Sequence, residues 1–294
     1  MTDQPKISIH IIAYNQKDYI REAIDSALAQ DYPNLEVVVA DDASTDGTAE
    51  IIAGYARDHL GRVIAVLNPD NLGITRNSNV GLRACSGDFI AFMGGDDVLL
   101  PGKISAQALW FAQDERRALC GHQVEVFYQD NSRPPHPLSR HLLAGTGAET
   151  FIKHNPFGAT AVMVRASRIP PYGFDETLPV VSDQMMWVDV LRDDGVFGFI
   201  PGTYSRYRQH DANVTRNPFA NLGDVERHLL NVAQRYPQFS SAVRWATTRR
   251  LYYDVGITLM AAGRKPEARR KFLSALRREP WFAKAWVRLA QTLA

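Results

Sequence analysis

The chain has 294 residues, of which 45% are hydrophobic and 22% charged, a composition that fits one large globular domain with a helical appendage. A formal net charge of +1 gives no sign of a polyanionic partner, so we expect no nucleic-acid partner. The only two cysteines, Cys85 and Cys120, exclude a disulfide framework and a zinc-binding spacing. Because the N-terminus lacks an apolar signal core and no apolar run reaches roughly 18 residues, we expect a cytoplasmic protein.

The charge is unevenly distributed along the chain. From Ser240 to the end, twelve Lys or Arg stand against three Asp or Glu, a balance of +9, and the remainder carries −8. A basic end on an acidic body favours peripheral contact with the inner face of a membrane or with an acidic partner. The alternative is a solvated basic face on helices that bind nothing.

Strand and helix patterns alternate over the first hundred residues. Short β-branched runs and helical spacings of apolar residues predict four strands, at 6–13, 36–40, 63–67 and 89–93, and three helices, at 17–30, 46–59 and 74–84. Alternation of this kind builds a parallel sheet with right-handed crossovers. We therefore expect an α/β fold with a Rossmann-like, mostly parallel sheet flanked by helices.

The pattern is looser after Pro101. It predicts helices at 104–113 and 185–191, strands at 123–128, 159–164 and 196–200, and a turn or loop at 131–137. From Phe219 onward the sequence reads helical. We expect a catalytic domain over residues 1–216 and a C-terminal helical region over 217–294.

The C-terminal region contains the pattern of one tetratricopeptide-like helical hairpin. The matching residues are Leu251, Gly256, Leu259, Gly263, Ala268, Phe272, Ala275, Leu276 and Pro280. A partial second unit begins at Ala285-Trp286. Because stacked repeats need about three copies to be stable alone, we interpret these helices as an extension packed on the catalytic domain, with a docking module as the alternative.

Polar residues follow three of the predicted strands at the point where each strand ends. Tyr14-Asn15 follow the first strand, Asp41-Asp42 the second and Asp96-Asp97 the fourth. Parallel strands present their carboxyl ends at one edge of the sheet, and ligands bind there. The sequence therefore predicts that these three clusters form a ligand site.

Asp96 and Asp97 are the strongest candidates for metal chemistry. Two adjacent buried carboxylates repel each other, and a divalent cation removes that conflict and can bridge diphosphate oxygens. Gly94 and Gly95 allow the sharp turn that precedes them. The alternative is a solvated turn with two surface acids.

The segment after the second strand combines two kinds of chemistry. An Asp directly after a buried strand can accept a hydrogen bond from a nucleotide base, which suits Asp41 and Asp42. Ser44 and Asp46 can instead cap the helix that follows. We therefore interpret the residues from Ser44 to Gly47 as turn and cap residues.

Five stretches together resemble one enzyme family. They are IIAYN (11–15), VVADDASTDGT (38–48), NLGITRNSNVGLRACSGDFIAFMGGDD (71–97), SDQMMW (182–187) and YRQHDANVT (207–215). Over about residues 6–216 the chain resembles the inverting glycosyltransferases of family 2, which have the GT-A fold. The resemblance implies transfer of a hexose from a nucleoside-diphosphate sugar, expected to be a UDP-sugar, to a hydroxyl of a glycan or lipid-linked acceptor in cell-surface polysaccharide synthesis.

The resemblance also implies which residues bind the donor. Tyr14 would lie against the base, with Ala13 and Asn15 lining the pocket, and Asp42 or Asp41 would hold the base. Arg76 matches the family's loop arginine near the nucleotide, with Asn77 supporting that loop. Asp96 would contact the ribose or the donor sugar.

For catalysis, the resemblance implies a metal cofactor, Mn²⁺ or Mg²⁺, with Asp97 and His210 as its ligands. Asp183 would be the general base that takes the proton of the acceptor hydroxyl. The family usually has an Asp where Gly94 stands here, which puts metal affinity in question. Arg206 and Arg208 are weaker candidates for contact with phosphate.

Alternatives remain for two residues of the SDQMMW stretch. Asp183 could be the N-cap of the helix predicted at 185–191, a role for which Ser182 competes, and Asp175 and Glu176 are rival acids for the base. Trp187 could line the acceptor pocket or fill the core, and we favour the pocket.

Two other functions compete with glycosyl transfer. A sugar-phosphate nucleotidyltransferase also uses a parallel sheet and Asp-bound Mg²⁺, but it carries a Gly-rich basic loop after the first strand. Here that position is Tyr14-Asn15-Gln16. The second is a non-catalytic binding module that acts through the C-terminal helices. The presence of Asp96, Asp97 and Asp183 argues against it, because such a module does not require catalytic carboxylates.

Overall fold

The computed structural model describes residues 4–138, 145–211, 213, 219 and 221–293. The chain forms two compact units, Met1–Thr150 with Asn155–Asn213, and Phe151–His154 with Val214–Ala294. The boundary expected between residues 216 and 217 lies outside the described residues, as do three positions of the YRQHDANVT stretch, Ala212, Val214 and Thr215.

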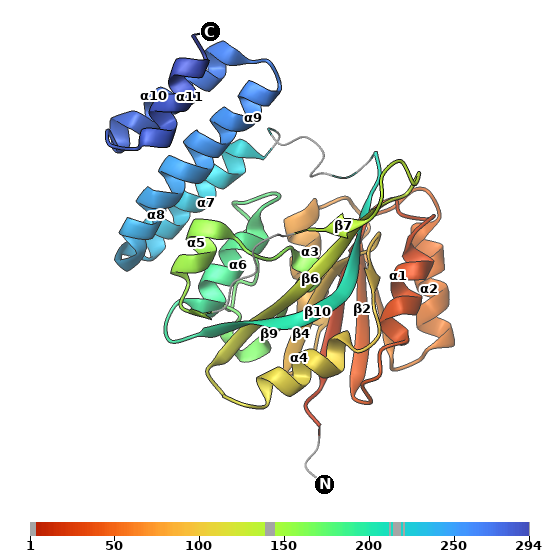
Figure 1. The fold of residues 1–294 in the computed structure, drawn as a ribbon. Helices are drawn as coiled ribbons and strands as arrows, with labels where there is room; N and C mark the ends of the chain where they lie inside the picture. The colour runs from red at the N-terminus through yellow and green to blue at the C-terminus, as the bar shows by residue number, and fades with distance from the viewer. Residues whose placement is uncertain (1–3, 139–144, 212, 214–218, 220, 294) are drawn as a thin grey trace. The chain divides into compact units, whose positions relative to one another are not determined.

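One mixed sheet forms the centre of the first unit (Figure 1). Among the described residues its strands are β1 (Ile7–Ala13), β2 (Leu35–Asp41), β3 (Val63–Leu67), β4 (Phe89–Gly94), β5 (Val98–Leu99), β6 (Arg117–Tyr128), β7 (His136–Pro137), β8 (Gly145–Thr146), β9 (Met163–Arg165) and β10 (Val196–Gln209). The main strand order is β3-β2-β1-β4-β9-β6-β10-β5. Strands β1 to β4 pair in parallel, and β9 joins β4 to β6 in antiparallel register.

The helices between and after these strands cover both faces of the sheet. They are α1 (Ile20–Leu28), α2 (Thr48–Asp58), α3 (Ile74–Ala84), α4 (Lys103–Phe111) and α6 (Ser182–Leu191), with 3₁₀ turns η1 (Ala159–Ala161) and η2 (Ala166–Arg168). The short helix α5 (Glu149–His154) begins in the first unit, and its residues Phe151–His154 belong to the second. Ile7, Ile9 and Ile11 of β1 pack with α1, α2 and α4 in one core cluster. On the other face, His10 approaches Gly81 of α3 and Phe92 of β4 packs on Trp187 of α6.

This arrangement explains why β1 and β2 lack an alternating polar pattern. Both strands are buried almost throughout, because helices cover the two faces that their side chains point toward. The α/β fold with a mostly parallel sheet, expected from the strand and helix periods, is confirmed.

Several predictions for the region after Pro101 were wrong in their bounds. β6 begins at Arg117 rather than at residue 123, and β10 continues to Gln209 rather than ending at residue 200. The run at 159–164 divides into η1 and the start of β9. Pro201 and Gly202 interrupt the apolar pattern of β10. The strand nevertheless continues, because its pairing with β6 shifts register around these two residues, and Gly202 has φ +124°. The segment expected as a loop at 131–137 also ends in the short strand β7.

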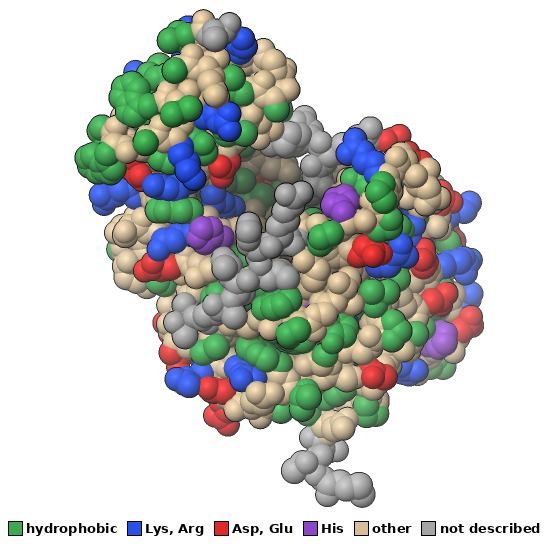
Figure 2. Space-filling model, in the orientation of Figure 1, with side chains coloured by type: hydrophobic (Ala, Val, Ile, Leu, Met, Phe, Trp, Pro, Cys, Tyr) green, Lys and Arg blue, Asp and Glu red, His purple; other side chains and the backbone are tan. Residues whose placement is uncertain are grey.

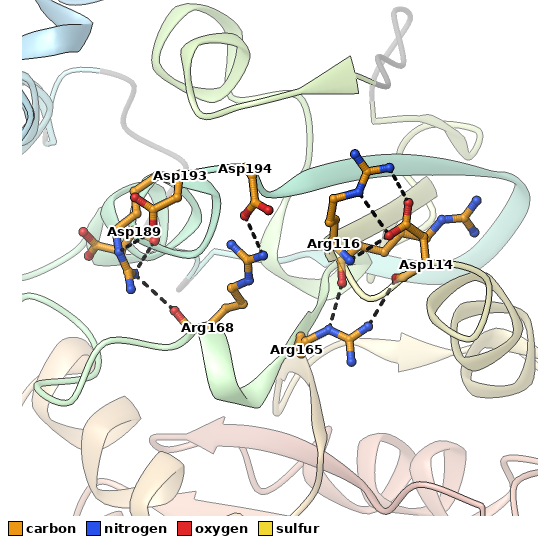
Figure 3. A network of polar contacts seen from close by, with 9 residues as sticks. Asp114, Arg116, Arg165, Arg168, Asp189, Asp193 and Asp194 are labelled. Atoms are coloured by element: carbon orange, nitrogen blue, oxygen red, sulfur yellow. Dashed lines mark hydrogen bonds and ion pairs between the residues drawn. The ribbon is translucent and has the colours of Figure 1, made fainter.

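A network of charged side chains joins elements at the edge of the sheet where β4 begins (Figure 3). Arg165 at the end of β9 donates to the carbonyls of Arg117 and Asp114, and Arg168 pairs with Asp194 at 2.8 Å. Arg165 also stacks over Phe89. These contacts lie at the opposite end of β4 from Gly94, so we assign them to stability of the fold.

The second unit is helical. Its described helices are α7 (Leu222–Arg235), α8 (Ser240–Ala246), α9 (Val255–Ala261), α10 (Lys265–Arg278) and α11 (Ala283–Gln291), with a 3₁₀ turn at Pro237–Phe239 and a π-helical segment at Thr247–Asp254. α9 and α10 form a hairpin around Gly263, which has φ +73°. Phe272 of α10 packs so closely on Gly256 of α9 that a Cβ there would lie 2.5 Å from its ring. None of the described helices is long and apolar enough to cross a membrane.

Candidate active site

The three polar clusters predicted from the strand ends meet at one edge of the sheet. Ala13 of β1 pairs with Asp41 of β2, and Ile12 pairs with Gly94 of β4. The Asp42 N–H donates to the Ala13 carbonyl at 2.9 Å, which continues the β1–β2 pairing by one residue. Tyr14, Asp42 and Asp96 therefore leave neighbouring strands at the same edge.

The loop after β1 is held in place by the loop after β2. Four hydrogen bonds join them: Asn15 N–H to Ser44 Oγ, Thr45 N–H to Asn15 Oδ1, Gln16 N–H to Thr48 Oγ1 and Lys17 N–H to Asp46 Oδ2, all between 2.8 and 3.0 Å. Asn15 adopts φ +51°, a left-handed conformation that Asn tolerates better than most residues. The fixed loop presents the Tyr14 side chain 49% exposed, as a base-stacking surface requires.

The expectation that Ser44 and Asp46 serve mainly as helix caps was therefore incomplete. Gly47, at φ +100°, is the N-cap of α2. Asp46 does accept hydrogen bonds from the Thr48 N–H and hydroxyl, but its second oxygen holds Lys17 of the other loop. The Ser44 hydroxyl connects Asn15 to Asp41. Only the tertiary pairing of β1 with β2 brings these partners together.

Asp41 and Asp42 are both buried, and each holds a backbone turn. Asp41 accepts from the Ser44 N–H at 2.9 Å and from its hydroxyl at 2.5 Å. Asp42 accepts from the N–H groups of Leu72 and Gly73 at 2.7 and 2.9 Å. These bonds shape the walls of the expected base pocket, and direct contact of either carboxylate with a base stays a prediction.

Arg76 and Asn77 have different positions at the start of α3. Asn77 is buried, donates to the Ala40 carbonyl at 3.0 Å and accepts from Asn68 at 2.8 Å. It therefore ties α3 to the end of β2. The Arg76 side chain is mostly exposed and pairs with Glu176 at 3.3 Å, so it can exchange that partner for an anionic ligand.

The end of β10 returns to the Gly-Gly-Asp-Asp turn. His210 Nε2 lies 2.9 Å from Asp96 Oδ2, and the Asn213 amide contacts the same oxygen at 3.3 Å. The ring of Tyr19, just before α1, stacks on His210 with centroids 4.9 Å apart. The structure therefore places His210 against Asp96.

Asp97 has a different environment. Its side chain is 3% exposed, and Oδ1 accepts a hydrogen bond from the Arg208 N–H at 3.2 Å. Burial and the neighbouring charge of Asp96 raise the pKa of Asp97 well above its usual value. The metal-ligand role predicted for Asp97 and the donor contact predicted for Asp96 both stay predictions.

Arg208, expected as a candidate for contact with phosphate, is buried and connects several elements, a role that sequence reasoning missed. Its guanidinium donates to the Asp96 carbonyl, to Gln129 and to Glu22 of α1, and it lies over the rings of Tyr19 and Phe127. Arg206, two residues earlier, instead pairs with Glu125 at 2.8 Å. Nothing in the local sequence distinguishes the two arginines, because their partners come from distant segments.

The turn has the oxygen chemistry that a divalent cation requires. A Cβ added to Gly94 would lie 2.6 Å from Asp96 Oδ1 and 3.6 Å from Asp97 Oδ2, so both carboxylates face the space that a side chain would fill. In the part of the chain that the structure describes, no group of three or more His, Cys, Asp or Glu forms a metal site. One or two carboxylates with substrate phosphate and water are a usual Mg²⁺ arrangement, and the Asp96 and Asp97 carboxylates have that chemistry. The His210 ring contacts Asp96, and its predicted role as a metal ligand stays a prediction.

Asp183 lies in the first turn of α6. Val181 is the N-cap of this helix, so neither Asp183 nor Ser182 has that role, and Asp183 Oδ1 accepts from the Gln184 N–H at 2.8 Å. The Thr75 hydroxyl joins α3 to this turn through the Leu178 carbonyl at 2.5 Å and the Ser182 hydroxyl at 2.9 Å. Arg76 follows Thr75 in the chain and Asp183 follows Ser182, so the bond between Thr75 and Ser182 positions both residues.

The rival acids have structural partners. Asp175 is buried and accepts from the N–H and hydroxyl of Thr177 at 3.0 and 2.7 Å, which closes a turn. Glu176 pairs with Arg76 and accepts from Asn79. The prediction that Trp187 lines the acceptor pocket was wrong, because its side chain is fully buried and packs edge-on against Phe92.

Comparison with known proteins identifies the family. The model of glycosyl transferase family 2 matches residues 8–168, more than half of the chain. The chain belongs to glycosyl transferase family 2. This confirms the resemblance found in the sequence motifs.

Curated relatives match part of this chain and part of their own length. An uncharacterised protein of Mycobacterium tuberculosis is 31% identical over 224 residues, covering 73% of this chain and 62% of the relative. The putative glycosyltransferase EpsE of Bacillus subtilis is 32% identical over 167 residues, covering 57% of this chain and 59% of the relative. The chain thus spans about 62% of the length of the first of these relatives.

A solved structure shares the fold. The crystal structure of S. aureus TarS 1–349 in complex with UDP-GlcNAc superposes with a TM-score of 0.70, covering 98% of this chain and 89% of that chain at 18% identity. At this identity the likeness shows the fold alone. The GT-A type expected for this family 2 chain is confirmed.

Proposed function

We propose that this protein transfers a sugar, with inversion, from a nucleoside-diphosphate sugar to a hydroxyl of a glycan or lipid-linked acceptor in cell-surface polysaccharide synthesis. The observation that carries the proposal is the meeting of Tyr14, Asp42 and Asp96 at the carboxyl edge of a family 2 sheet. The complexes of S. aureus TarS, which has the same fold, with UDP and UDP-GlcNAc support a UDP-sugar as donor.

The donor lies along the strand ends in this proposal. The base stacks on Tyr14, whose loop is fixed by the four bonds to the loop after β2. Asp41 and Asp42 hold the turns on either side of the base, and Arg76 turns from Glu176 to the diphosphate. A guanidinium binds diphosphate oxygens in paired hydrogen bonds, which an exposed arginine at the start of a helix can supply.

Asp96 and His210 form the wall nearest the diphosphate, with Asp97 beneath them. Bound Mn²⁺ or Mg²⁺ would neutralise charge on the departing nucleoside diphosphate. We propose Asp96 as the direct ligand, in place of the Asp97 expected from the resemblance, because the Asp97 carboxylate is buried and accepts a hydrogen bond from the Arg208 N–H.

Asp183 acts as the general base. An acceptor hydroxyl is too weak an acid to attack unaided, so a carboxylate must take its proton as the new glycosidic bond forms. The N-terminus of α6 favours a negative charge at Asp183. Attack opposite the leaving group inverts the anomeric centre, so no covalent intermediate and no second carboxylate are needed.

The test is release of nucleoside diphosphate from a panel of nucleotide sugars with Mn²⁺ or Mg²⁺. We expect slow hydrolysis of one donor, which an acceptor accelerates. Asp183→Asn should bind that donor normally but lose transfer by about 10²- to 10⁴-fold. Asp193→Asn, an exposed acid just past the other end of α6, is the matched control and should retain activity.

Two results would contradict the proposal. Retained transfer in Asp183→Asn would remove the general base from the mechanism. Pyrophosphate release from a nucleoside triphosphate and a sugar phosphate, without donor hydrolysis, would instead identify a nucleotidyltransferase.

A further inference from the structure

The residues in and next to α11 repeat, after 34 positions, the pattern of the residues in and next to α9. Tyr252 corresponds to Trp286, Val255 to Leu289, Gly256 to Ala290 and Leu259 to Leu293. In the first copy, α10 covers this pattern, with Phe272 seated on Gly256 and in one cluster with Val255 and Leu259. The second copy, in and next to α11, has the residue types with which α9 binds a neighbouring helix.

One face of α11 is firmly docked. Ala285 is fully buried, and Leu289 packs against the α9–α10 cluster. Arg269 of α10 donates to the Thr292 carbonyl at 2.8 Å. α11 is therefore a fixed part of the second unit, and its outward face has a defined position on α10.

The outward face of α11 is apolar. Ala283, Trp286, Val287, Ala290 and Leu293 follow helical spacing, and Trp286, Val287 and Leu293 are 53%, 59% and 70% exposed. We call these five residues the α11 stripe. The Trp286 indole is oriented by its N–H donating to the Pro280 carbonyl at 2.7 Å. An exposed apolar patch bordered by polar residues marks an interaction site, so this stripe indicates a binding surface.

The surroundings of the stripe are basic. Between Lys265 and Gln291 the chain has eight Lys or Arg and two acids. Both acids have basic partners, since Glu267 pairs with Arg264 and Glu279 with Arg249. Lys284 and Arg288 of α11 are exposed beside the stripe. Figure 2 shows hydrophobic side chains gathered among Lys and Arg side chains on these helices.

We propose that the α11 stripe binds an amphipathic helix with acidic flanks, in the way that α9 binds α10. Complementary charge favours an acidic partner, whereas a second copy would bring like charges together. The small residue Ala290, where Gly256 admits Phe272, favours a helix that inserts a large side chain. An anionic membrane would also attract the basic flanks, but binding to a membrane does not require a small residue at position 290. The inference is independent of the proposed reaction.

The experiment measures binding of a synthetic peptide to the full chain by fluorescence anisotropy. The peptide keeps the α10 residues Ala268, Phe272, Ala275 and Leu276 in their spacing and has Glu in place of the Lys and Arg of α10. Ala290→Arg adds bulk at the centre of the stripe and also adds positive charge. Ala262→Arg, at an exposed position after α9, makes the same change away from the stripe.

We expect the peptide to bind the wild-type chain and Ala262→Arg alike, and Ala290→Arg at least about tenfold more weakly. Circular dichroism verifies that both variants fold. Equal binding by the two variants, or no binding at about 100 μM peptide, would overturn the proposal.

Two further measurements distinguish the other occupants. The first is binding to phosphatidylglycerol vesicles. If the chain binds the vesicles but not the peptide, and Ala290→Arg preserves or strengthens vesicle binding, the stripe binds a membrane and the helix proposal is overturned. A dimer in sedimentation velocity that Ala290→Arg dissociates would assign it to a second copy and overturn it equally.

Discussion

His210 Nε2 lies 2.9 Å from Asp96 Oδ2, and this contact joins the end of β10 to the turn after β4. The two residues are 114 positions apart in the chain, so only the return of β10 across the sheet brings them together. A carboxylate oriented by an imidazole presents its other oxygen in a fixed direction. That oxygen faces the space beside Gly94.

If Asp96 and His210 act as one unit, their substitutions should not be additive. We expect Asp96→Asn and His210→Ala each to reduce kcat/KM by about 10²-fold. The kcat/KM of the double variant should be only slightly lower than that of the less active single variant. The measurement is a double-mutant cycle on nucleoside diphosphate release. His136→Ala, an exposed histidine on β7, is the control. Fully multiplicative losses would show that the two side chains act separately.

Arg208 should be important for stability as well as for the site. Arg208→Lys keeps the charge but loses the forked contacts with Gln129, Glu22 and the Asp96 carbonyl. We expect the free energy of unfolding to fall by about 2 to 4 kcal/mol, because a lysine ammonium cannot satisfy all three partners of the guanidinium and leaves buried polar groups unpaired. Denaturant titration measures this.

Arg206→Lys is the matched control on the same strand. Its side chain is partly exposed and pairs with a partly exposed Glu125, so the loss should be below about 1 kcal/mol. Equal losses in the two variants would contradict the role assigned to Arg208.

Gly94→Asp tests the cation proposal without an activity assay. The added Cβ would lie 2.6 Å from Asp96 Oδ1, so the carboxylate must rotate and three acids would share the turn. Their repulsion should lower Tm in a chelator, and Mn²⁺ should raise Tm more than it does in the wild type.

Gly94→Ala separates the steric effect from the charge. It should lower Tm in the chelator without a larger Mn²⁺ response. If the Asp variant responds to Mn²⁺ no more than the Ala variant, the carboxylates at this turn do not bind the ion.

His10 should make the protein less stable at acidic pH. It is buried on β1, where burial lowers its pKa to about 4, and a backbone contact at Ser78 opposes this only in part. Below pH 6.5 His10 binds a proton in the unfolded chain, whereas in the folded chain it binds one only below about pH 4. The free energy of unfolding therefore falls by about 1.4 kcal/mol per pH unit over this window, about 3 kcal/mol in total.

Denaturant titrations between pH 7.5 and 4 measure this contribution as a difference between variants. His10→Leu should show a shallower loss of stability than the wild type. His136→Leu removes an exposed histidine and should follow the wild-type curve. Parallel curves for the wild type and His10→Leu would mean that His10 is protonated in the folded state.

The sequence by itself determined the βα order and the edge at which the site forms. Apolar period and strand length are local properties, and a parallel sheet places the ends of β1, β2 and β4 together without further information. Five local motifs over about residues 6–216 were sufficient to recognise the family, whose model matches residues 8–168.

Only the tertiary structure decided which polar residues act on one another. It placed Arg208 under the Asp96 turn and Arg206 outside it, although the two have similar local sequence. It buried Trp187 and paired Ser44 with Asn15. These outcomes depend on contacts between segments far apart in the chain, and neither side-chain periodicity nor residue type specifies such contacts, because each depends on how β10, α6 and the strand-end loops pack.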